Sequence, residues 1–311
     1  MKTPSFRVLP AVAALLLAPT LLFSVQTTPD KVKAEPVRGG IFLIDGPLPN
    51  CVVLAGPDGT LLVDSGEDDA YAAAIGEAVT EIAPRPVRFL LNTHKHFDHV
   101  NGNAFFANKG ATLIAQASVR AELVDEGNLP PEALPEIVFE DSMTFFFDGE
   151  EILLHHPETG GAHTFGDTVV YFRKADVLCA GDLFCNGMFP YLDPKGGNTE
   201  GIVKSLREAA SLIGDKTIVI PGHGALSDKK GMLHYADLLE GAAHSITTLM
   251  EKGLSLKEIQ AAKPTAPYDA ELGALTITMF GKDYRTGPDR IVEIVYENNR
   301  ARGIGRAQSG N

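Results

Sequence analysis

The chain has 311 residues, of which 44% are hydrophobic and 22% are charged, so it can build a sizeable core and is not expected to be disordered. Its formal net charge of −13 at pH 7 disfavours contact with phosphate backbones, and no nucleic-acid partner is expected. The three cysteines, Cys51, Cys179 and Cys185, are not a disulfide framework, although one pair could form in an oxidising compartment.

The N-terminus has the pattern of a secretory signal. Lys2 and Arg7 precede an apolar run that continues to Phe23. Two prolines and the modest length of this run argue against a stable membrane helix. We therefore predict a signal peptide or N-terminal anchor over residues 1–25 and a periplasmic or secreted location. Membrane contact is expected only through this segment, if it is not cleaved.

The rest of the chain alternates apolar runs with turn residues. Residues 27–38 are polar and contain prolines, which predicts a loose lead-in. The helix that begins near Thr199 is predicted to use this residue as its N-cap. Strands are predicted at 41–44, 51–55, 60–64, 87–92, 112–115, 143–147, 151–155, 168–172, 177–180 and 217–220. Helices are predicted at 69–82, 118–126, 199–213, 229–252, 255–262 and 290–297.

A cluster of metal-ligand residues follows the apolar strand at 87–92. Three imidazoles and one carboxylate fall within six residues, at His94, His96, Asp98 and His99. Neutral imidazole and carboxylate are ligands that suit borderline cations such as zinc. His94 and His96 can converge on one side of an extended turn, while Asp98 and His99 can point to a second position beside it. The spacing predicts two metal ions rather than one.

Four ligands cannot complete two coordination shells, and three further candidates share a similar context. His163 lies in a glycine-rich turn, Asp182 ends the strand at 177–180, and His223 ends the strand at 217–220. Glycine allows close backbone approach, which suits a ligand loop. A carboxylate at Asp182 can bridge two cations.

These residues resemble the motifs of the metallo-β-lactamase superfamily over roughly residues 39–236. The motifs are, in order, Asp64-Ser65-Gly66, the His-x-His-x-Asp-His loop, Gly-x-His-Thr, Gly-Asp and Gly-His-Gly. The resemblance implies an α/β fold, an αββα sandwich of two mixed β-sheets flanked by helices, with the metals at the sheet edge. We expect a hydrolase domain over residues 39–262, followed by a C-terminal helical extension and a frayed tail over residues 263–311.

The resemblance also implies two Zn²⁺ ions per chain. One would be held by His94, His96 and His163, and the other by Asp98, His99 and His223, with Asp182 bridging them.

Three carboxylates have further predicted roles. Asp98 is a catalytic candidate because it could orient the nucleophile or carry its proton. Asp64 and Asp167 could each orient a ligand imidazole, or each could simply cap its own turn.

The predicted activity is hydrolysis of a small ester, lactone, thioester or β-lactam by a metal-bound hydroxide. β-Lactamases of the cysteine-ligand type have Cys at the position of Asp182, a Lys at the position of Cys185, and usually no His at the position of His99. The present residues therefore disfavour efficient β-lactam hydrolysis, although Lys195 could replace the missing Lys. Cys185 is expected at the pocket rim.

Three alternatives remain open at this point. An iron-dependent sulfur dioxygenase would use the same fold, a phosphodiesterase would need basic residues near the site, and a non-catalytic protein would bind without turnover. The pattern leaves the oligomeric state open. Aromatic and apolar residues after Asp182 fit either the core or a pocket wall, namely Phe184, Met188, Phe189 and Tyr191.

Overall fold

The computed structural model describes residues 32–44, 49–274, 276–279 and 282–304. The predicted signal peptide or anchor at residues 1–25 and most of the predicted frayed tail lie outside these residues. None of the helices in the described ranges combines the length and the apolar character that a membrane crossing requires.

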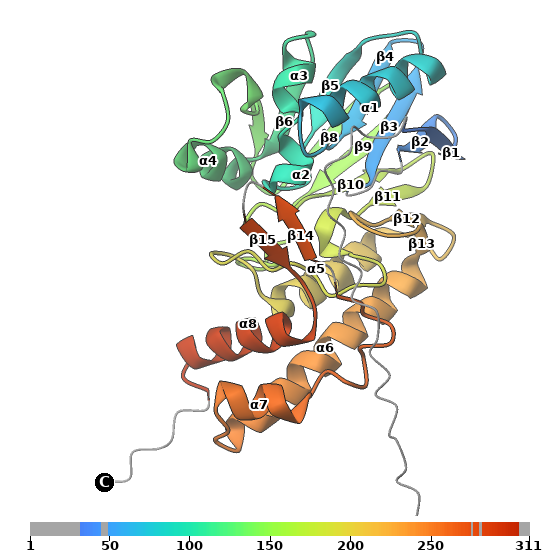
Figure 1. Cartoon of the computed structure of the whole chain (residues 1–311). Helices are drawn as coiled ribbons and strands as arrows, with labels where there is room; N and C mark the ends of the chain where they lie inside the picture. The colour runs from blue at the N-terminus through green and yellow to red at the C-terminus, as the bar shows by residue number, and fades with distance from the viewer. Residues whose placement is uncertain (1–31, 45–48, 275, 280–281, 305–311) are drawn as a thin grey trace, which may run out of the picture.

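Two β-sheets form the centre of the molecule, between outer helices (Figure 1). The first sheet has the strand order β1 to β7. Its first four strands pair antiparallel and β4 to β7 pair parallel, so the sheet is mixed. The strands are β1 Ala34–Arg38, β2 Ile41–Ile44, β3 Cys51–Gly56, β4 Gly59–Val63, β5 Val87–Leu91, β6 Thr112–Gln116 and β7 Ile137–Phe139.

The second sheet has the order β13-β12-β11-β10-β9-β8 and is also mixed. Only β11 and β12 pair parallel, while the other neighbours pair antiparallel. The strands are β8 Ser142–Phe147, β9 Glu150–His155, β10 Val169–Phe172, β11 Val177–Cys179, β12 Ile218–Ile220 and β13 Ser227–Asp228. These two sheets confirm the predicted αββα sandwich.

Helices cover the outer faces of both sheets. The α-helices are α1 Asp69–Ile82, α2 Phe97–Val100, α3 Asn103–Ala107, α4 Ala117–Glu126, α5 Thr199–Leu212, α6 Lys229–Glu251, α7 Leu256–Ala262 and α8 Pro288–Ala301. Two short 3₁₀ helices, η1 Pro131–Ala133 and η2 Gly181–Leu183, occur in loops. Figure 1 shows α1 and α3 near the first sheet, and α5, α6 and α8 at the opposite end of the molecule.

Side-chain alternation along β4 explains why its apolar run is continuous. Leu61 and Val63 point into the core between the two sheets, whereas Leu62 points into the core under α1. Successive residues of a strand face opposite sides of its sheet, and both sides are covered here. A run without polar residues is therefore what a central strand of this sandwich requires.

Three predictions about local structure were wrong. Residues of the supposed loose lead-in form β1, an edge strand in which no side chain is buried, so the sequence has no alternation of apolar and polar residues there. The N-cap of α5 is Asn198 rather than Thr199, because the Asn198 side chain accepts from the backbone N–H of Gly201 at 2.6 Å. The C-terminal part is not only helical, since it contains the hairpin β14 Thr276–Met279 and β15 Lys282–Arg285.

The C-terminal helix packs on the same core as its neighbours. Ile291 and Val292 of α8 are each 2% exposed and belong to one cluster with Leu206 of α5 and Leu239 of α6. The boundary predicted between residues 262 and 263 stays a prediction.

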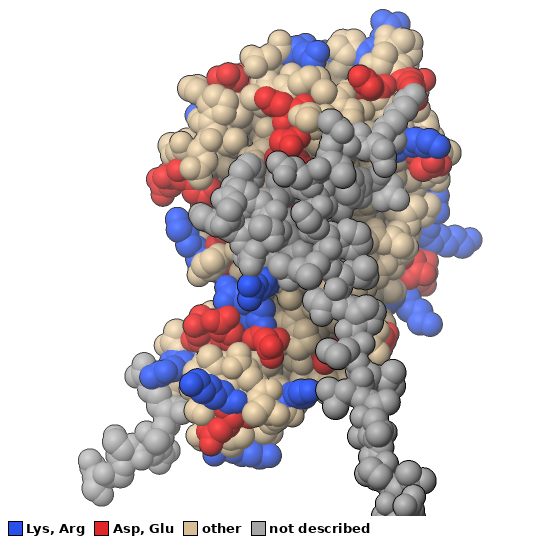
Figure 2. Space-filling model, viewed as in Figure 1, with Lys and Arg blue, Asp and Glu red and all other residues tan. Residues whose placement is uncertain are grey.

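Surface charges on the described part of one face are interspersed by sign (Figure 2). Exposed charges of opposite sign also pair between helices, since Arg207 of α5 contacts Asp237 at 3.2 Å and Glu240 at 2.7 Å on α6. Such exposed pairs contribute only about 0–1 kcal/mol each, so packing decides the fold.

We predict that Leu61→Ala lowers the free energy of unfolding by about 2–5 kcal/mol, because Leu61 is fully buried between the sheets and its loss leaves a cavity. Urea denaturation measures this. Leu226→Ala is the control, since Leu226 is 41% exposed, and it should cost less than about 1 kcal/mol. Equal losses in the two variants would contradict the assignment of Leu61 to the core.

Candidate metal centre

The seven predicted ligands come from five segments that meet at one edge of the sandwich. His94 and His96 follow β5, and His163 lies in the loop between β9 and β10. Asp182 lies in η2 after β11, and His223 follows β12. Because β11 and β12 are parallel, their carboxyl ends lie at the same edge. Asp98 and His99 are in α2.

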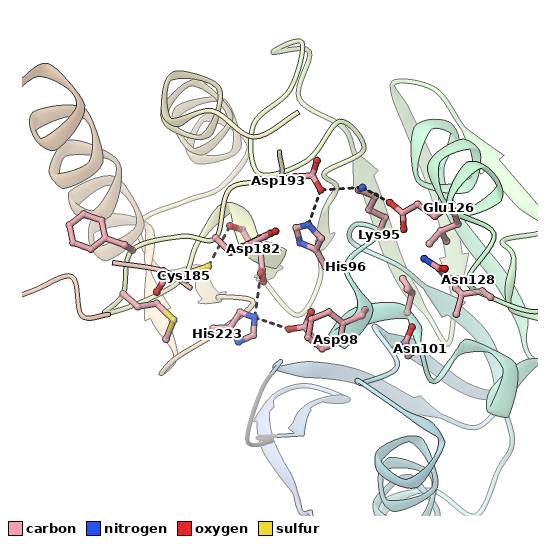
Figure 3. Close-up of a pocket in the computed structure, with 18 residues that line it drawn as sticks. Lys95, His96, Asp98, Asn101, Glu126, Asn128, Asp182, Cys185, Asp193 and His223 are labelled. Carbon is pink, nitrogen blue, oxygen red and sulfur yellow. Dashed lines mark hydrogen bonds and ion pairs between the residues drawn. The ribbon is translucent and has the colours of Figure 1, made fainter. Parts of the chain in front are cut away.

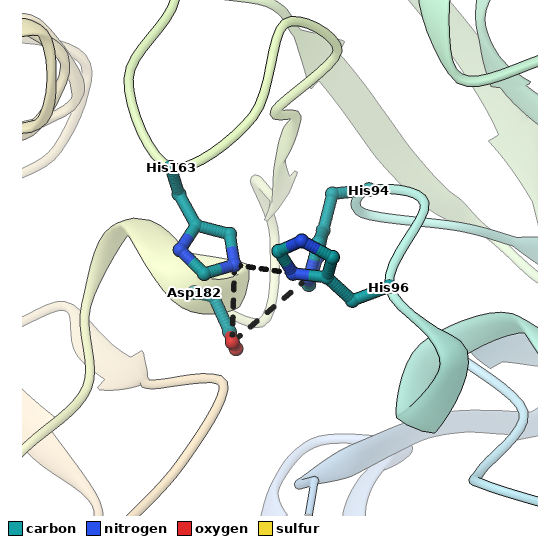
Figure 4. Close-up of side chains that lie close together, drawn as sticks. All are labelled: His94, His96, His163 and Asp182. Carbon is teal, nitrogen blue, oxygen red and sulfur yellow. Dashed lines mark hydrogen bonds and ion pairs between the residues drawn. The ribbon is translucent and has the colours of Figure 1, made fainter. Parts of the chain in front are cut away.

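Four of these side chains form a first group (Figure 4). Nδ1 of His96 lies 3.0 Å from Nε2 of His94 and 2.8 Å from Nε2 of His163. Asp182 Oδ2 lies 3.4 Å from His163 Nε2 and 3.9 Å from His94 Nε2. Three nitrogens and one oxygen thus converge on one point, as tetrahedral coordination requires.

Asp98, His99 and His223 form a second group beside the first. His223 Nε2 is 3.3 Å from Asp98 Oδ2, and His99 Nε2 is 3.7 Å from the same oxygen. Asp182 also reaches this group, with Oδ1 3.3 Å from His99 Nε2 and Oδ2 3.3 Å from His223 Nε2. The structure thus brings together the side chains that the resemblance implies for each ion, and Asp182 lies within 3.9 Å of imidazoles of both groups.

Two orphaned atoms in the cluster fit a bound cation. His99 Nε2 and Asp182 Oδ1 are fully buried and lie 3.3 Å apart, yet neither makes a hydrogen bond. Buried polar atoms are normally satisfied, so these atoms need a ligand. Imidazole nitrogens and carboxylate oxygens are donors that zinc and other borderline divalent ions accept.

The protonation of the cluster depends on the charge of Asp182. Burial would raise the pKa of Asp182, but His223 and His99 hold it well below its usual value. Burial lowers the pKa of His163 to about 3, with a further contribution from His96. Burial would also lower the pKa of His223, but Asp182 raises it to about 10. Without a cation, protons on His99 and His223 balance the carboxylates, so metal uptake should release protons.

Asp64 orients one of the ligand imidazoles. Its Oδ2 accepts from His99 Nδ1 at 2.8 Å, which leaves Nε2 of that ring directed at the cluster. Its two oxygens also accept from the backbone N–H and the hydroxyl of Thr93, at 2.8 and 2.7 Å. Asp64 is 1% exposed and has a φ of +62°, so it is held in a backbone conformation that favours glycine.

Asp167 supports a ligand in a different way. It contacts no ligand ring, which corrects the expectation that it orients an imidazole. Its Oδ2 accepts from the backbone N–H groups of His163 and Thr164 at 2.8 and 2.9 Å, and its Oδ1 accepts from the Thr164 hydroxyl at 2.7 Å. Asp167 therefore caps the turn that carries His163, which is the second of the two roles considered for it from the sequence.

Several supporting residues were not identified from the sequence. Asn50 donates to the carbonyls of Pro221 and Gly224, at 2.9 and 2.8 Å, and so holds the loop of His223. Asn103 donates to Asn92, and both belong to a buried network under the His99 carbonyl. Asparagine is common in turns, and only the tertiary contacts reveal these roles.

Asp193 is the most consequential of the missed residues. Its Oδ2 lies 3.3 Å from His96 Nε2, the ring nitrogen that does not face the first group, and 3.1 Å from Lys95 Nζ. Lys95 also donates to Glu126 at 2.7 Å. Burial would lower the pKa of Lys95, but Glu126 and Asp193 raise it above its usual value. The charged Lys95 therefore connects Asp193, which contacts His96, to Glu126 at the end of α4.

A cavity of about 630 Å³ opens over the cluster (Figure 3). His96, Asp98, Asp182 and His223 form its floor, and Cys185 lines it at 2% exposure. Met188, Phe189 and Tyr191 also line it, whereas Phe184 is core and packs on Tyr235. Lys195 is not among the described lining residues.

Three histidines outside the cluster have structural partners. His155 pairs with Glu208 at 2.6 Å, His156 bonds to the Asp167 carbonyl at 2.7 Å, and His234 pairs with Glu271 at 2.7 Å. The three cysteines are buried and free.

Comparison with known proteins identifies the family. The model of the metallo-beta-lactamase superfamily matches residues 44–223, which contain all seven candidate ligands. This chain belongs to that superfamily. Members of the family that match it are metal-dependent hydrolases, which bears out the enzyme class predicted from the motifs.

Individual relatives are distant. The 2,4-dinitroanisole O-demethylase subunit alpha of Nocardioides sp. is 28% identical over 194 residues, which cover 61% of this chain and 56% of the relative. The chain thus matches little more than half of that protein. The metallo-beta-lactamase type 2 of Bacillus cereus is 26% identical over 195 residues, covering 61% of this chain and 73% of the relative.

Among solved structures, the sec-alkylsulfatase Pisa1 from Pseudomonas sp. shares the fold at a TM-score of 0.70 and 17% identity. The matched part covers 90% of this chain and 51% of the alkylsulfatase chain. Two solved metallo-β-lactamases cover 67% and 69% of this chain, at TM-scores of 0.59 and 0.58. The likeness to the alkylsulfatase therefore extends over more of the chain.

We predict that Asp64→Asn weakens metal binding about 10–100-fold. The substitution keeps the shape of the side chain but replaces the charged carboxylate that accepts a hydrogen bond from His99 Nδ1. Competition with a chromogenic chelator measures the affinity. Asp215→Asn, an exposed change of the same kind, should leave it unaltered. Wild-type affinity in Asp64→Asn would remove Asp64 from the support of the site.

We also predict that Gly222→Ala costs about 1–3 kcal/mol of stability and reduces metal content, because a Cβ there would lie 1.9 Å from Asp182 Oδ1. Thermal unfolding and elemental analysis measure the two effects. Gly214→Ala serves as control, because a Cβ there would make only an ordinary contact, with Thr217 Oγ1 at 4.0 Å. A Gly222→Ala protein with full metal content would show that Asp182 does not need its present position.

Proposed function

We propose that this protein is an exported binuclear zinc hydrolase that cleaves a small ester, lactone, thioester or β-lactam. The observation that carries the proposal is the position of Asp182, whose carboxylate contacts imidazoles of both ligand groups at 3.3–3.9 Å. A carboxylate between two ligand sets supports a pair of ions better than a single one. Export is proposed from the N-terminal apolar run alone.

The chain's own residues prepare the site for hydrolysis. Two bound zinc ions would supply the nucleophile by lowering the pKa of a water between them toward about 7. Asp98 lines the cavity, and although burial would raise its pKa, His99 and His223 lower it. An ionised Asp98 can accept a proton from the attacking water and hold that water in place.

The metal alternatives differ in their ligands. Mononuclear iron sites commonly use two imidazoles and one carboxylate and leave positions open. The present cluster supplies seven side chains, which supports two ions rather than one. Metal content therefore separates the zinc hydrolase from the iron dioxygenase.

The cavity also bears on the phosphodiesterase alternative. Of its described lining residues, Lys95 is the one with a cationic side chain outside the metal ligands, and it is already paired with Asp193 and Glu126. A phosphodiester carries a charge that needs such a partner, so the lining favours other substrates.

The decisive experiment combines two variants with metal analysis. Purified protein should contain about two zinc ions per chain and hydrolyse at least one member of a panel of p-nitrophenyl esters, thioesters, lactones and nitrocefin. A chelator should abolish turnover, and zinc should restore it.

His96→Ala and Asp182→Ala should each lose metal and at least about 1,000-fold in kcat/KM, because each removes a ligand that no other side chain replaces. Glu240→Gln, an exposed change on α6, is the matched control. Full turnover in metal-free protein would overturn the proposal, and one iron per chain with oxygen uptake would replace it with the dioxygenase.

A further inference from the structure

The walls of the cavity above the metal centre combine apolar side chains with polar ones. Phe97 and Val100 of α2 form one part, and Leu123 of α4 with Leu129 extends it. Met188, Phe189 and Tyr191 form the wall on the side of the loop after Asp182. Apolar walls of this kind bind the hydrocarbon part of a ligand by removing it from water.

Outside the metal ligands, the one cationic side chain in this described lining already has anionic partners. Lys95 is 6% exposed, and its Nζ lies 2.7 Å from Glu126, 3.1 Å from Asp193 and 3.9 Å from Glu122. Three carboxylates therefore surround one ammonium group. Figure 3 shows Glu126 and Asp193 on either side of Lys95, with Asn128 and Asn101 nearby.

The three carboxylates around Lys95 disfavour an anionic group on a ligand bound next to them. An anionic group that lies beside Lys95, away from the metal ions on the cavity floor, would meet Glu126 and Asp193, whose charges the single ammonium of Lys95 balances only in part. At an effective dielectric constant of about 20, a like charge roughly 8 Å away costs enough to change affinity by a factor of ten or more. Two polar lining residues without charge, Asn101 and Asn128, can bond to an uncharged polar group.

We infer that the cavity selects substrates whose group beyond the scissile bond is uncharged and mainly apolar, and that Lys95 with its three carboxylates is the element that rejects anionic ones. The substrate class is thus a neutral acyl ester, thioester or lactone rather than an ester or β-lactam that carries a carboxylate away from the scissile bond. This inference rests on the proposed hydrolase function of the same site.

A matched pair of esters tests the inference. p-Nitrophenyl valerate and the p-nitrophenyl monoester of glutaric acid differ in a terminal methyl group replaced by a carboxylate. We expect kcat/KM to be at least about tenfold higher for the valerate ester. Glu126→Gln, which removes one carboxylate from Lys95, should reduce this ratio about threefold or more. Glu240→Gln, which removes an exposed carboxylate paired with Arg207, should leave the ratio unchanged.

A binding measurement tests the same point without turnover. In cobalt-substituted protein, 4-mercaptobutan-1-ol and 4-mercaptobutanoate should each produce a thiolate–cobalt absorption band. The neutral thiol should bind at least about tenfold tighter than the anionic thiol. The ratio of the two dissociation constants should fall in Glu126→Gln and stay the same in Glu240→Gln. Equal or tighter binding of the anionic thiol, or faster turnover of nitrocefin or the glutarate ester than of the valerate ester, would overturn the inference. Absence of any cobalt band would instead overturn the metal centre of the proposed function.

Discussion

The carboxylate of Asp182 is the constraint on which the site depends. It is 6% exposed and surrounded by His94, His99, His163 and His223, so it has lost water and needs cations in return. A buried carboxylate is stable only with charged partners and complete hydrogen bonding, and part of its bonding capacity is unfilled. The site therefore favours a charged, bound state over an empty one, and its folding and metal uptake should be linked.

The scaffold positions the ligands in two ways. It brings strand ends together, and carboxylates outside the ligand set form hydrogen bonds to the ligand residues. Parallel β11 and β12 deliver Asp182 and His223 to one edge, and Gly222 leaves the space that Asp182 occupies. Asp64 fixes one imidazole through its ring, Asp167 fixes another through its backbone, and Asp193 contacts a third. Ligands held in this way keep their geometry when the metal is absent, which makes binding less costly. The same Asp193 links the metal site to the cavity wall through Lys95.

Much of the fold and all seven candidate ligands could be read from the sequence, because apolar runs buried on both faces and ligand residues at strand ends are local signals. The strand β4 and the helix α1 illustrate this, since their limits agree with the predicted ones within one residue. The edge strand β1 could not be read, because pairing with β2 rather than its own pattern stabilises it. Asp193 lies 97 residues from His96, and the contact arises only when η2 and its loop fold against α2. Supporting roles of this kind depend on tertiary structure.

The most direct test of the central claim is a crystal structure of the zinc-loaded protein with anomalous diffraction measured at the zinc absorption edge. The account predicts two zinc peaks about 3.5–4 Å apart, with oxygens of Asp182 bound to both and the imidazoles divided as described. A single zinc peak, or two peaks of which only one contacts Asp182, would contradict it.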